Sequence, residues 1–477
     1  MTDEATRPDA KPSFTRAFWT ANCVELLERA AWYGVFVAIT LYLSRILGFS
    51  DIEAAAVSGV FSAGLYLLPT FSGALADKIG FRRALLLAFS LLTVGYAGMW
   101  LLPTLFEGAG LVTYGKEVEF TGLKDGAYRW LFVPVMLVVM VGGSFIKSVI
   151  TGTVARETTT LTRARGYSIF YAMVNIGAFG GKTVVKPLRE AMGNEGLIVL
   201  NLFAASMTAL AFLLVLFLYK NTGHSDEHSK SLAEIWASLK AVLSRARLVI
   251  LILIITGFWM VQHQLYATMP KYVLRMAGEG ASPSWYANVN PAVVVLTVGA
   301  VTTMMRHRTA LTSMTVGMFI MPLSAFFMAS GNMIGGDPIL GLHPVAFMMI
   351  IGIAFQGFAE SFISPRFLEY FSRQAPRGEE GLYLGFSHLH SFLSSLLGFI
   401  TSGFLLEAFC PDPSTLSAAE QAQYDAAIAG TAAMPAAYAH AHYIWFVFVG
   451  VAAVAAVALV IFGRVVARID RRAGADA

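Results

Sequence analysis

The chain has 477 residues and a formal net charge of +4; 56% of its residues are hydrophobic and only 13% are charged. Soluble globular proteins carry about a quarter charged residues, so this composition excludes a soluble domain and indicates a membrane protein. The two cysteines, Cys23 and Cys410, lie in or beside hydrophobic stretches and provide no disulfide framework.

Spans of about 20 apolar residues, long enough to cross a bilayer as helices, recur along the whole chain. We expect twelve of them, and an even number places both termini on the same side of the membrane. In chain order they lie near residues 17–46, 52–76, 84–106, 130–154, 166–190, 197–219, 248–274, 284–305, 310–333, 341–371, 380–409 and 441–466.

The polar segments between the spans predict orientation and domains. Loops on the side of the termini carry 23 lysines and arginines, against eight in the opposite loops, so the positive-inside rule predicts cytoplasmic termini. A cytoplasmic linker at 220–247 separates a first six-helix bundle, 1–219, from a second, 248–477. Residues 231–243 are predicted to form an amphipathic helix on the membrane surface, and 411–440 an external, partly helical loop.

The loop after the second span reads GALADKIGFRR at residues 73–83. Its glycines permit close helix approach and a turn, and its aspartate is favourable at a helix N-terminus. Its two arginines are expected on the cytoplasmic side of the membrane. An ordinary polar turn would share these features, but their order resembles the signature of the major facilitator superfamily. The resemblance implies a conformational motif made of Gly73, Asp77, Gly80, Arg82 and Arg83.

The first span contains Glu25, Glu28 and Arg29 on one helical stripe, although a charge at the bilayer centre costs roughly 2.5–3.5 kcal/mol. Together with Tyr33, this ELLER sequence resembles the ExxER…YY motif of proton-coupled oligopeptide transporters, a family of the major facilitator superfamily. Further similar stretches are YLLPTFSGALAD (66–77), GGSFIKSVITG (142–152), YSIFYAMVNIGAFGG (167–181), FWMVQHQ (258–264), NP (290–291) and ESFISP (360–365).

The resemblance implies an all-α membrane protein with the major facilitator superfamily fold: twelve transmembrane helices in two six-helix bundles, with both termini cytoplasmic. It also implies a proton-coupled symporter that imports peptides of two or three residues by alternating access. Such a protein is multi-pass in a bacterial-type inner membrane, works as a monomer, contacts lipid, protons and peptide, binds no nucleic acid and is not an enzyme.

The buried charges can also be interpreted without the family. Glu25, Glu28, Arg29 and Lys147 sum to zero, so the first bundle gains surplus positive charge whenever one glutamate is protonated. Glu360 is the clearest buried charge of the second bundle. A zwitterion bridging the bundles would place its carboxylate against the cations and its ammonium against Glu360. This complementarity favours a peptide or an amino acid over an anion such as nitrate.

Two groups of site residues follow. We expect proton coupling at Glu25, Glu28, Arg29 and Lys147. We expect substrate binding at Arg29, Tyr33, Tyr66, Lys147, Asn175, Trp259, His263, Asn290, Glu360 and Ser364. Each also has a structural interpretation, because ion pairs, aromatic rings and asparagines all serve helix packing. Intramembrane charges most often mark ion or substrate pathways, which favours function. Lys182, nearer the outer side, is expected to snorkel outward.

The chain departs from the resembled family at the outer gate. Typical members place an arginine three residues after the second tyrosine of helix 1 and a glutamate on helix 7. Phe36 and His263 stand at these positions, and Ser387 stands where helix 11 usually has a tryptophan. A titrating His263 could replace the glutamate, or it could be a neutral residue of the cavity wall. We expect coupling to rest on helix 1.

No metal or cofactor site is expected. His388 and His390 are two residues apart, so on a helix they would face nearly opposite ways and could not ligate one ion. No HExxH, P-loop, GxSxG or GxGxxG sequence occurs in a suitable context, which argues against an enzyme or an ATP-driven pump. Two alternatives to peptide import stay open: another small solute, such as amino acids or nitrate, and a transport-inactive receptor.

Overall fold

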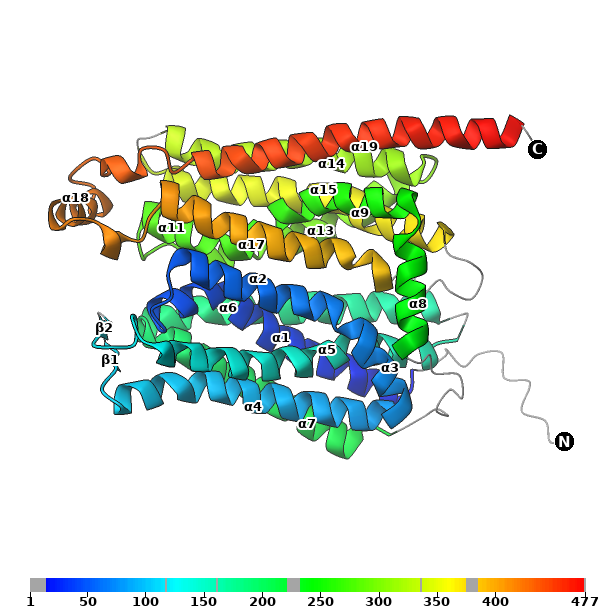
Figure 1. Ribbon diagram of the computed structural model, residues 1–477, viewed down its shortest axis with the longest axis horizontal. Coiled ribbons are helices and arrows are strands. Elements are labelled where there is room, and N and C mark those ends of the chain that lie inside the picture. The colour runs from blue at the N-terminus through cyan, green and yellow to red at the C-terminus, as the bar shows by residue number, and fades with distance from the viewer. Residues whose placement is uncertain are drawn as a thin grey trace.

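A computed structural model of the protein describes residues 14–115, 118–159, 162–220, 232–334, 337–374 and 385–475. Long helices dominate it and run roughly along its longest axis (Figure 1). Within these described ranges, ten helices are long and apolar enough to cross a membrane. The protein is therefore a multi-pass membrane protein.

The helices from α1 to α7, which we call the first half, lie together in the lower part of Figure 1. They are α1 (Arg16–Arg45), α2 (Asp51–Leu67), α3 (Pro69–Ile79), α4 (Phe81–Gly108), α5 (Phe132–Arg156), α6 (Arg163–Met192) and α7 (Glu195–Leu218). Between α4 and α5 the chain forms an antiparallel pair, β1 (Val112–Thr113) and β2 (Glu119–Phe120), and the 3-10 helix η1 (Ala127–Leu131).

The helices from α9 to α19, the second half, lie in the upper part of the same view. They are α9 (Ala246–Gln262), α10 (Gln264–Ala267), α11 (Met269–Ala277), α12 (Pro283–Tyr286), α13 (Val289–Met304), α14 (Ala310–Ile334), α15 (Pro344–Gln374), α17 (Leu389–Phe409), α18 (Ala418–Ile428) and α19 (Tyr443–Ala475). The short 3-10 helices η2 (Pro413–Thr415) and η3 (Ala436–Tyr438) flank α18.

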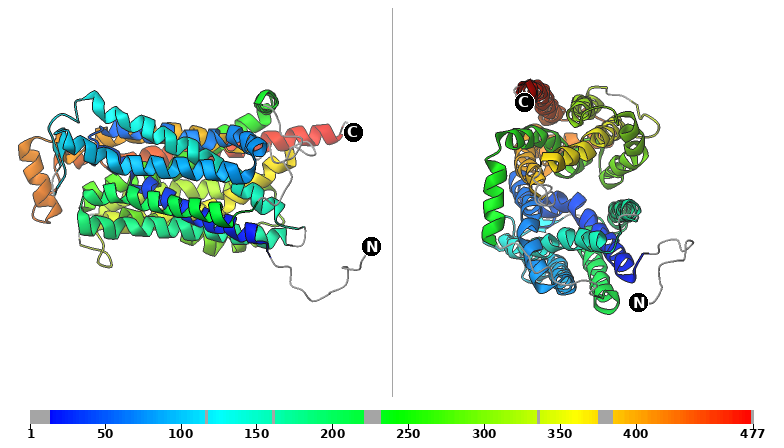
Figure 2. Two further views of the ribbon diagram at one scale, coloured as in Figure 1. Left: turned by 90° about the horizontal axis from the view of Figure 1, so that it is seen from below. Right: turned by 90° about the vertical axis from the view of Figure 1, so that its right-hand side faces the viewer.

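Two segments outside the long helices agree with the sequence predictions. The predicted amphipathic helix at 231–243 is α8 (Leu232–Leu243), which runs across both halves in Figure 1. The predicted partly helical loop at 411–440 contains α18. Figures 1 and 2 show α18 at the end of the molecule opposite the start of α1 and the close of α19. We call this end the α18 end.

Two of the twelve predicted spans are not among the ten apolar helices. The span predicted at 52–76 is divided into α2 and α3 at Leu68, where Pro69 supplies no backbone N–H to continue the helix. The span predicted at 166–190 is α6, which is long but carries many polar residues. The number of spans, the cytoplasmic side of the termini and the domain limits at 219 and 248 stay predictions.

The predicted conformational motif forms the turn from α3 into α4. Gly80 has φ +87°, a region that side chains with a Cβ atom avoid, and it ends α3. Arg82 donates hydrogen bonds of 3.1 and 2.8 Å to backbone carbonyls at the close of α7. Gly73 lies against a serine of α5, and Arg83 is exposed. Asp77 belongs to α3, but its side chain lies outside the described part of the structure.

The segment 246–277 of the second half is broken into three helices, α9, α10 and α11. His263 separates the first two and Thr268 the last two. Pro270, in the first turn of α11, has no N–H and so cannot continue the hydrogen-bond ladder from α10. The interruption lies about midway between the ends of the protein, where α10 contacts α1 and α17.

Close packing of α6 on α1 depends on small residues. A Cβ atom at Gly181 would lie 2.2 Å from the backbone oxygen of Ala30 and 2.9 Å from the backbone nitrogen of Gly34. Real Cβ atoms cannot approach backbone atoms so closely, so only glycine fits at this crossing. The contact sets the position of the residues on both helices that face the second half.

We predict that Gly181→Ala destabilises the protein by about 1–3 kcal/mol, because the added methyl group would push α6 away from α1. The change should appear as a lower unfolding temperature in detergent, followed by tryptophan fluorescence. The matched control is Gly180→Ala, since nothing lies within 4 Å of a Cβ atom there. Alanine favours a helix by up to about 1 kcal/mol over glycine, so this control should be neutral or stabilising. Equal unfolding temperatures for the two variants would contradict the packing argument.

Candidate functional site

A cavity of about 370 Å³ lies between the two halves, near the middle of the long helices. Its wall is made by residues from α1, α2, α5 and α6 on one side and α9, α10, α13, α15 and α17 on the other. Nine residues predicted to bind substrate belong to this wall: Tyr33, Tyr66, Lys147, Asn175, Trp259, His263, Asn290, Glu360 and Ser364. The tenth, Arg29, is not among the lining residues.

Arg29 holds both predicted coupling glutamates on one turn of α1. Its Nε lies 3.2 Å from Glu25 Oε1, and its Nη2 pairs with Glu28 Oε2. The two carboxylates are only 5% and 4% exposed. Two buried acids thus share one guanidinium, one helical turn below Tyr33 of the cavity wall. With both acids ionised the cluster has one negative charge in excess, so one of the glutamates can take up a proton when no second cation is close.

Lys147 brings a second cation into the cavity from α5. Its ammonium lies 5.7 Å from the centre of the Tyr66 ring on α2, a cation–π distance. Among the described residues no carboxylate lies within ion-pair distance of Lys147. The predicted set of Glu25, Glu28, Arg29 and Lys147 is therefore one paired cluster beside the cavity and one unpaired lysine in its wall.

Glu360 faces the cavity from α15 on the opposite side. Its Oε2 accepts hydrogen bonds from Gln262 Nε2 at 2.8 Å and from Asn290 Nδ2 at 3.3 Å. Both donors are neutral amides, and within the described chain Oε1 accepts no hydrogen bond. The carboxylate is therefore oriented by its neighbours but not neutralised by them. Asn290, predicted either to bind substrate or to join helices, orients this acid.

Lys182 is a lining residue that the sequence interpretation missed. It was expected to snorkel outward, but its side chain is only 2% exposed and belongs to the cavity wall. Its Nζ donates to the backbone oxygen of Ala287 in the second half at 3.2 Å. The ammonium lies 5.1 Å from the centre of the Tyr33 ring and 5.7 Å from that of Tyr266. The second half covers the lysine through Ala287, and the side chain lies in the cavity wall instead of at the protein surface.

Histidines and aromatic rings form the wall on the second half. Trp259 stacks on His390 with ring centres 5.4 Å apart, and His263 Nε2 lies 3.3 Å from Ser395 Oγ. His388 also lines the cavity, so the prediction that it and His390 face opposite ways is wrong. The reason is that His388 precedes the first turn of α17 and does not follow helical periodicity. No group of three potential metal ligands occurs among the described residues.

Other predicted residues differ in how they are held. Asn175 donates to the backbone oxygen of Tyr171 on its own helix at 2.8 Å, so it does not join helices. The buried hydroxyl of Ser364 has no hydrogen-bond partner in the described chain and is available to a ligand. Phe36 packs on Trp32 and Tyr266, with ring centres 4.5 and 5.0 Å apart. Phe36 stands where typical members of the resembled family have an arginine of the outer gate. At this position the structure has an aromatic contact and no ion pair.

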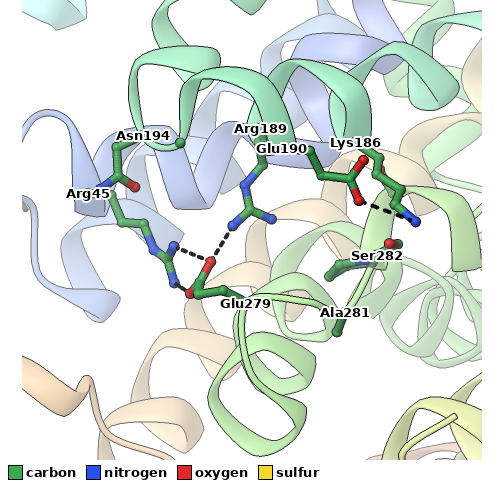
Figure 3. A pocket seen from close by; sticks show the side chains of 11 residues that line it. Arg45, Lys186, Arg189, Glu190, Asn194, Glu279, Ala281 and Ser282 are labelled. Atoms are coloured by element: carbon green, nitrogen blue, oxygen red, sulfur yellow. Dashed lines mark hydrogen bonds and ion pairs between the residues drawn. The ribbon is translucent and has the colours of Figure 1, made fainter. Parts of the chain in front are cut away.

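Ion pairs between the halves lie instead at the α18 end. Glu279, between α11 and α12, accepts from Arg45 of α1 at 2.6 and 3.0 Å and from Arg189 of α6 at 2.5 Å (Figure 3). Burial alone would raise the pKa of Glu279, but its hydrogen bonds from Arg45 and the charges of both arginines lower it below the ordinary value. Glu279 is therefore ionised at neutral pH and joins both arginines across the interface.

A second, more deeply buried ionic cluster lies at the same end. Asp51, the first residue of α2, pairs with Lys271 at 2.6 Å and with Arg275 at 2.7 and 3.0 Å, both on α11. The three side chains are 2–5% exposed. Arg275 also reaches Asp412 at 2.9 Å. The ion pairs of Asp51 and Glu279 therefore join the two halves at the α18 end of the cavity.

Comparison with known proteins gives similar sequences and folds. Dipeptide and tripeptide permease A of Proteus mirabilis (strain HI4320) is 34% identical over 120 residues, which are 22% of this chain and 25% of that protein. The Citrobacter koseri (strain ATCC BAA-895) permease of the same name is 26% identical over 260 residues, 53% of this chain and 45% of the relative. The chain thus matches less than half the length of these curated relatives.

Solved structures share the fold over nearly the whole chain. A crystal structure of tetrameric PepTSo2 has a TM-score of 0.68 at 18% identity and covers 96% of this chain and 100% of the other. A structure described for substrate recognition in proton dependent oligopeptide transporters has a TM-score of 0.66 at 18% identity, covering 95% and 100%. The family model described as Major Facilitator Superfamily matches residues 22–342, more than half of the chain, and the chain therefore belongs to the Major Facilitator Superfamily.

Proposed function

We propose that the protein is a proton-coupled symporter that imports short peptides by alternating access. The observation that carries this proposal is the pair of opposed, unpaired charges in the cavity, Lys147 from the first half and Glu360 from the second. A peptide is a zwitterion, and its carboxylate and ammonium complement these two groups. The names of the similar permeases support the same substrate class. The chain is a transporter and not an enzyme.

Protons couple to transport through the cluster on α1. Glu25, Glu28 and Arg29 carry one excess negative charge when both acids are ionised, and a proton or Lys147 can compensate it. When the substrate carboxylate engages Lys147, that lysine no longer compensates the acids. Proton uptake by a glutamate then keeps the buried cluster neutral. Binding of peptide and binding of a proton therefore favour each other.

The conformation described here corresponds to a state closed toward the outside. We assign the α18 end to the external face, in line with the predicted cytoplasmic termini. The ionic clusters of Asp51 and Glu279 join the two halves at this end. Near the other end, the pairs Arg247–Asp470 and Arg366–Glu369 each stay within the second half. In alternating access the bundles 1–219 and 248–477 rock about the central cavity and are joined by the linker 220–247.

One chain supplies every residue of the cavity wall, so we take the monomer as the transporting unit. The PepTSo2 structures are tetrameric, and assembly of that kind is compatible with one complete pathway in each subunit. The protein works in a bacterial-type inner membrane with protons and a short peptide as its cargo, and the length limit of two or three residues follows from the resembled family.

The proposal predicts saturable uptake of a labelled dipeptide into liposomes that contain the purified protein and carry a pH gradient, acid outside. Unlabelled dipeptide should compete, whereas nitrate should not, because nitrate has no ammonium for Glu360. Glu360→Gln should weaken a peptide with a free amino terminus by about tenfold, the equivalent of one charge-assisted contact. N-acetylated peptide is the matched control and should be affected little. Equal losses for both ligands would show that Glu360 does not bind the peptide amine. If only nitrate or only amino acids competed, the substrate would be that solute and not a peptide.

Glu28→Gln should separate proton coupling from substrate binding. The amide retains the shape of the side chain but cannot titrate, so accumulation under a pH gradient should fall by at least tenfold. Peptide exchange across membranes with equal pH on both sides should survive. The two assays use the same liposomes, which controls for the amount of folded protein. Parallel loss of exchange and accumulation would mean that Glu28 stabilises the helix packing instead. His263→Gln is the comparison variant and should still accumulate peptide.

Asp51→Asn should weaken closure of the α18 end. The change leaves Lys271 and Arg275 buried without their carboxylate, which costs about 3–5 kcal/mol in the closed state. The measurement is the labelling rate of a single cysteine at position 175 in the cavity, with an impermeant maleimide added on the α18 side and the two native cysteines replaced by serine. The rate should rise. Glu190→Gln, which loses only an exposed pair of 3.5 Å with Lys186, should leave it unchanged. An unchanged rate in folded Asp51→Asn protein would exclude this cluster from the gate.

A further inference from the structure

The cavity holds two lysines on neighbouring helices of the first half. Lys147 on α5 and Lys182 on α6 both belong to its wall. Neither ammonium lies within ion-pair distance of a carboxylate among the residues that the structure describes. Glu360 is the acid whose charge attracts Lys182. In the transport proposed above, the peptide ammonium engages Glu360 and its carboxylate engages Lys147, which leaves Lys182 without a counter-charge.

Lys182 is only partly satisfied by its protein neighbours. An ammonium has three N–H donors, and within the described chain one of them has an acceptor, the backbone oxygen of Ala287 at 3.2 Å. The rings of Tyr33 and Tyr266 face the charge at 5.1 and 5.7 Å. Aromatic faces attract a cation but do not neutralise it. A buried ammonium with two free donors at a cavity wall is a site for an anionic group.

The spacing of the two lysines fits two carboxylates on one small ligand. α5 starts and α6 ends at the α18 end, and counted from those ends Lys182 is five residues nearer to it than Lys147. At a rise of 1.5 Å per residue the offset along the helices is roughly 8 Å. In a dipeptide whose first residue is acidic, such as glutamyl-alanine, the side-chain carboxylate and the terminal carboxylate belong to different residues and can lie this far apart. Glu360 and its two amide partners face the same space from the other half.

We propose that Lys182 binds a second carboxylate of the substrate, so that the transporter prefers peptides with an aspartate or glutamate side chain over neutral peptides of the same size. The proposal rests on peptide transport as proposed above and adds the side-chain class. It differs from a purely structural role, in which Lys182 only fastens α6 to the second half through Ala287. A structural contact would affect all peptides alike.

The test compares glutamyl-alanine with glutaminyl-alanine, which differ by one charge at nearly constant shape. Each competes with labelled dialanine for exchange into liposomes at equal pH, with the membrane potential held at zero so that substrate charge does not alter the driving force. In the wild type the half-inhibiting concentration should be about tenfold lower for glutamyl-alanine. Lys182→Met should bring the ratio close to one, and Lys182→Arg should preserve the preference because arginine keeps the charge.

Lys186→Met is the matched control, since this lysine lies one turn further along α6, outside the cavity, and pairs with Glu190. It should leave the ratio unchanged. Equal inhibition by both peptides in the wild type overturns the proposal even if Lys182→Met does not fold. A Lys182→Met protein that weakens both peptides equally overturns it in favour of the structural role. Absence of dialanine exchange in the wild type would instead contradict peptide transport itself.

Discussion

A charge buried between membrane helices needs a counter-charge or a ligand, and this constraint accounts for where the ionised side chains of the protein lie. Arg29 is held by two acids, and Asp51 is held by two bases. Lys147, Lys182 and Glu360 form no ion pair within the described chain, and all three line one cavity. Pairing satisfies the charges within the fold, and the unpaired charges of the cavity are the basis on which we propose that a ligand binds there.

Much of the fold follows from hydropathy and from the chemistry of turns. Apolar length places the long helices, and the amphipathic pattern of 231–243 predicts α8. A turn at Gly80 is expected because glycine tolerates the positive φ that the structure shows there. The same reasoning could not find the division of a span at Leu68 or at His263 and Thr268. Mean hydropathy is averaged over a window of residues. A break in the helical backbone within an apolar stretch does not change this average, so hydropathy cannot reveal the break.

Residues of the candidate site could be predicted where a charged residue is part of a recognisable motif. They could not be predicted where contacts between distant parts of the chain determine whether a side chain is buried. Glu360, Lys147 and Tyr33 reach the cavity as expected. Lys271 and Arg275 are two of the eight lysines and arginines that the sequence analysis counts in the loops opposite the termini, whereas both are buried in α11 against Asp51. Their partner lies more than 200 residues away, and no local pattern in a single sequence announces such a pair. Lys182 was misjudged for a similar reason, because the second half covers the surface that it would otherwise reach.

The interrupted rod α9–α10–α11 has a mechanical consequence. Three short segments joined at His263 and Thr268 bend more easily than one continuous helix, because the missing backbone hydrogen bonds make each junction a compliant joint. α11 carries both cations that pair with Asp51, so a tilt of this nine-residue lever would be enough to separate them while α9 keeps its packing on α17 and α19. His263 forms one joint and also lines the cavity. A ligand in the cavity therefore contacts one of the two joints that connect α9 with the helix whose cations hold the α18 end closed.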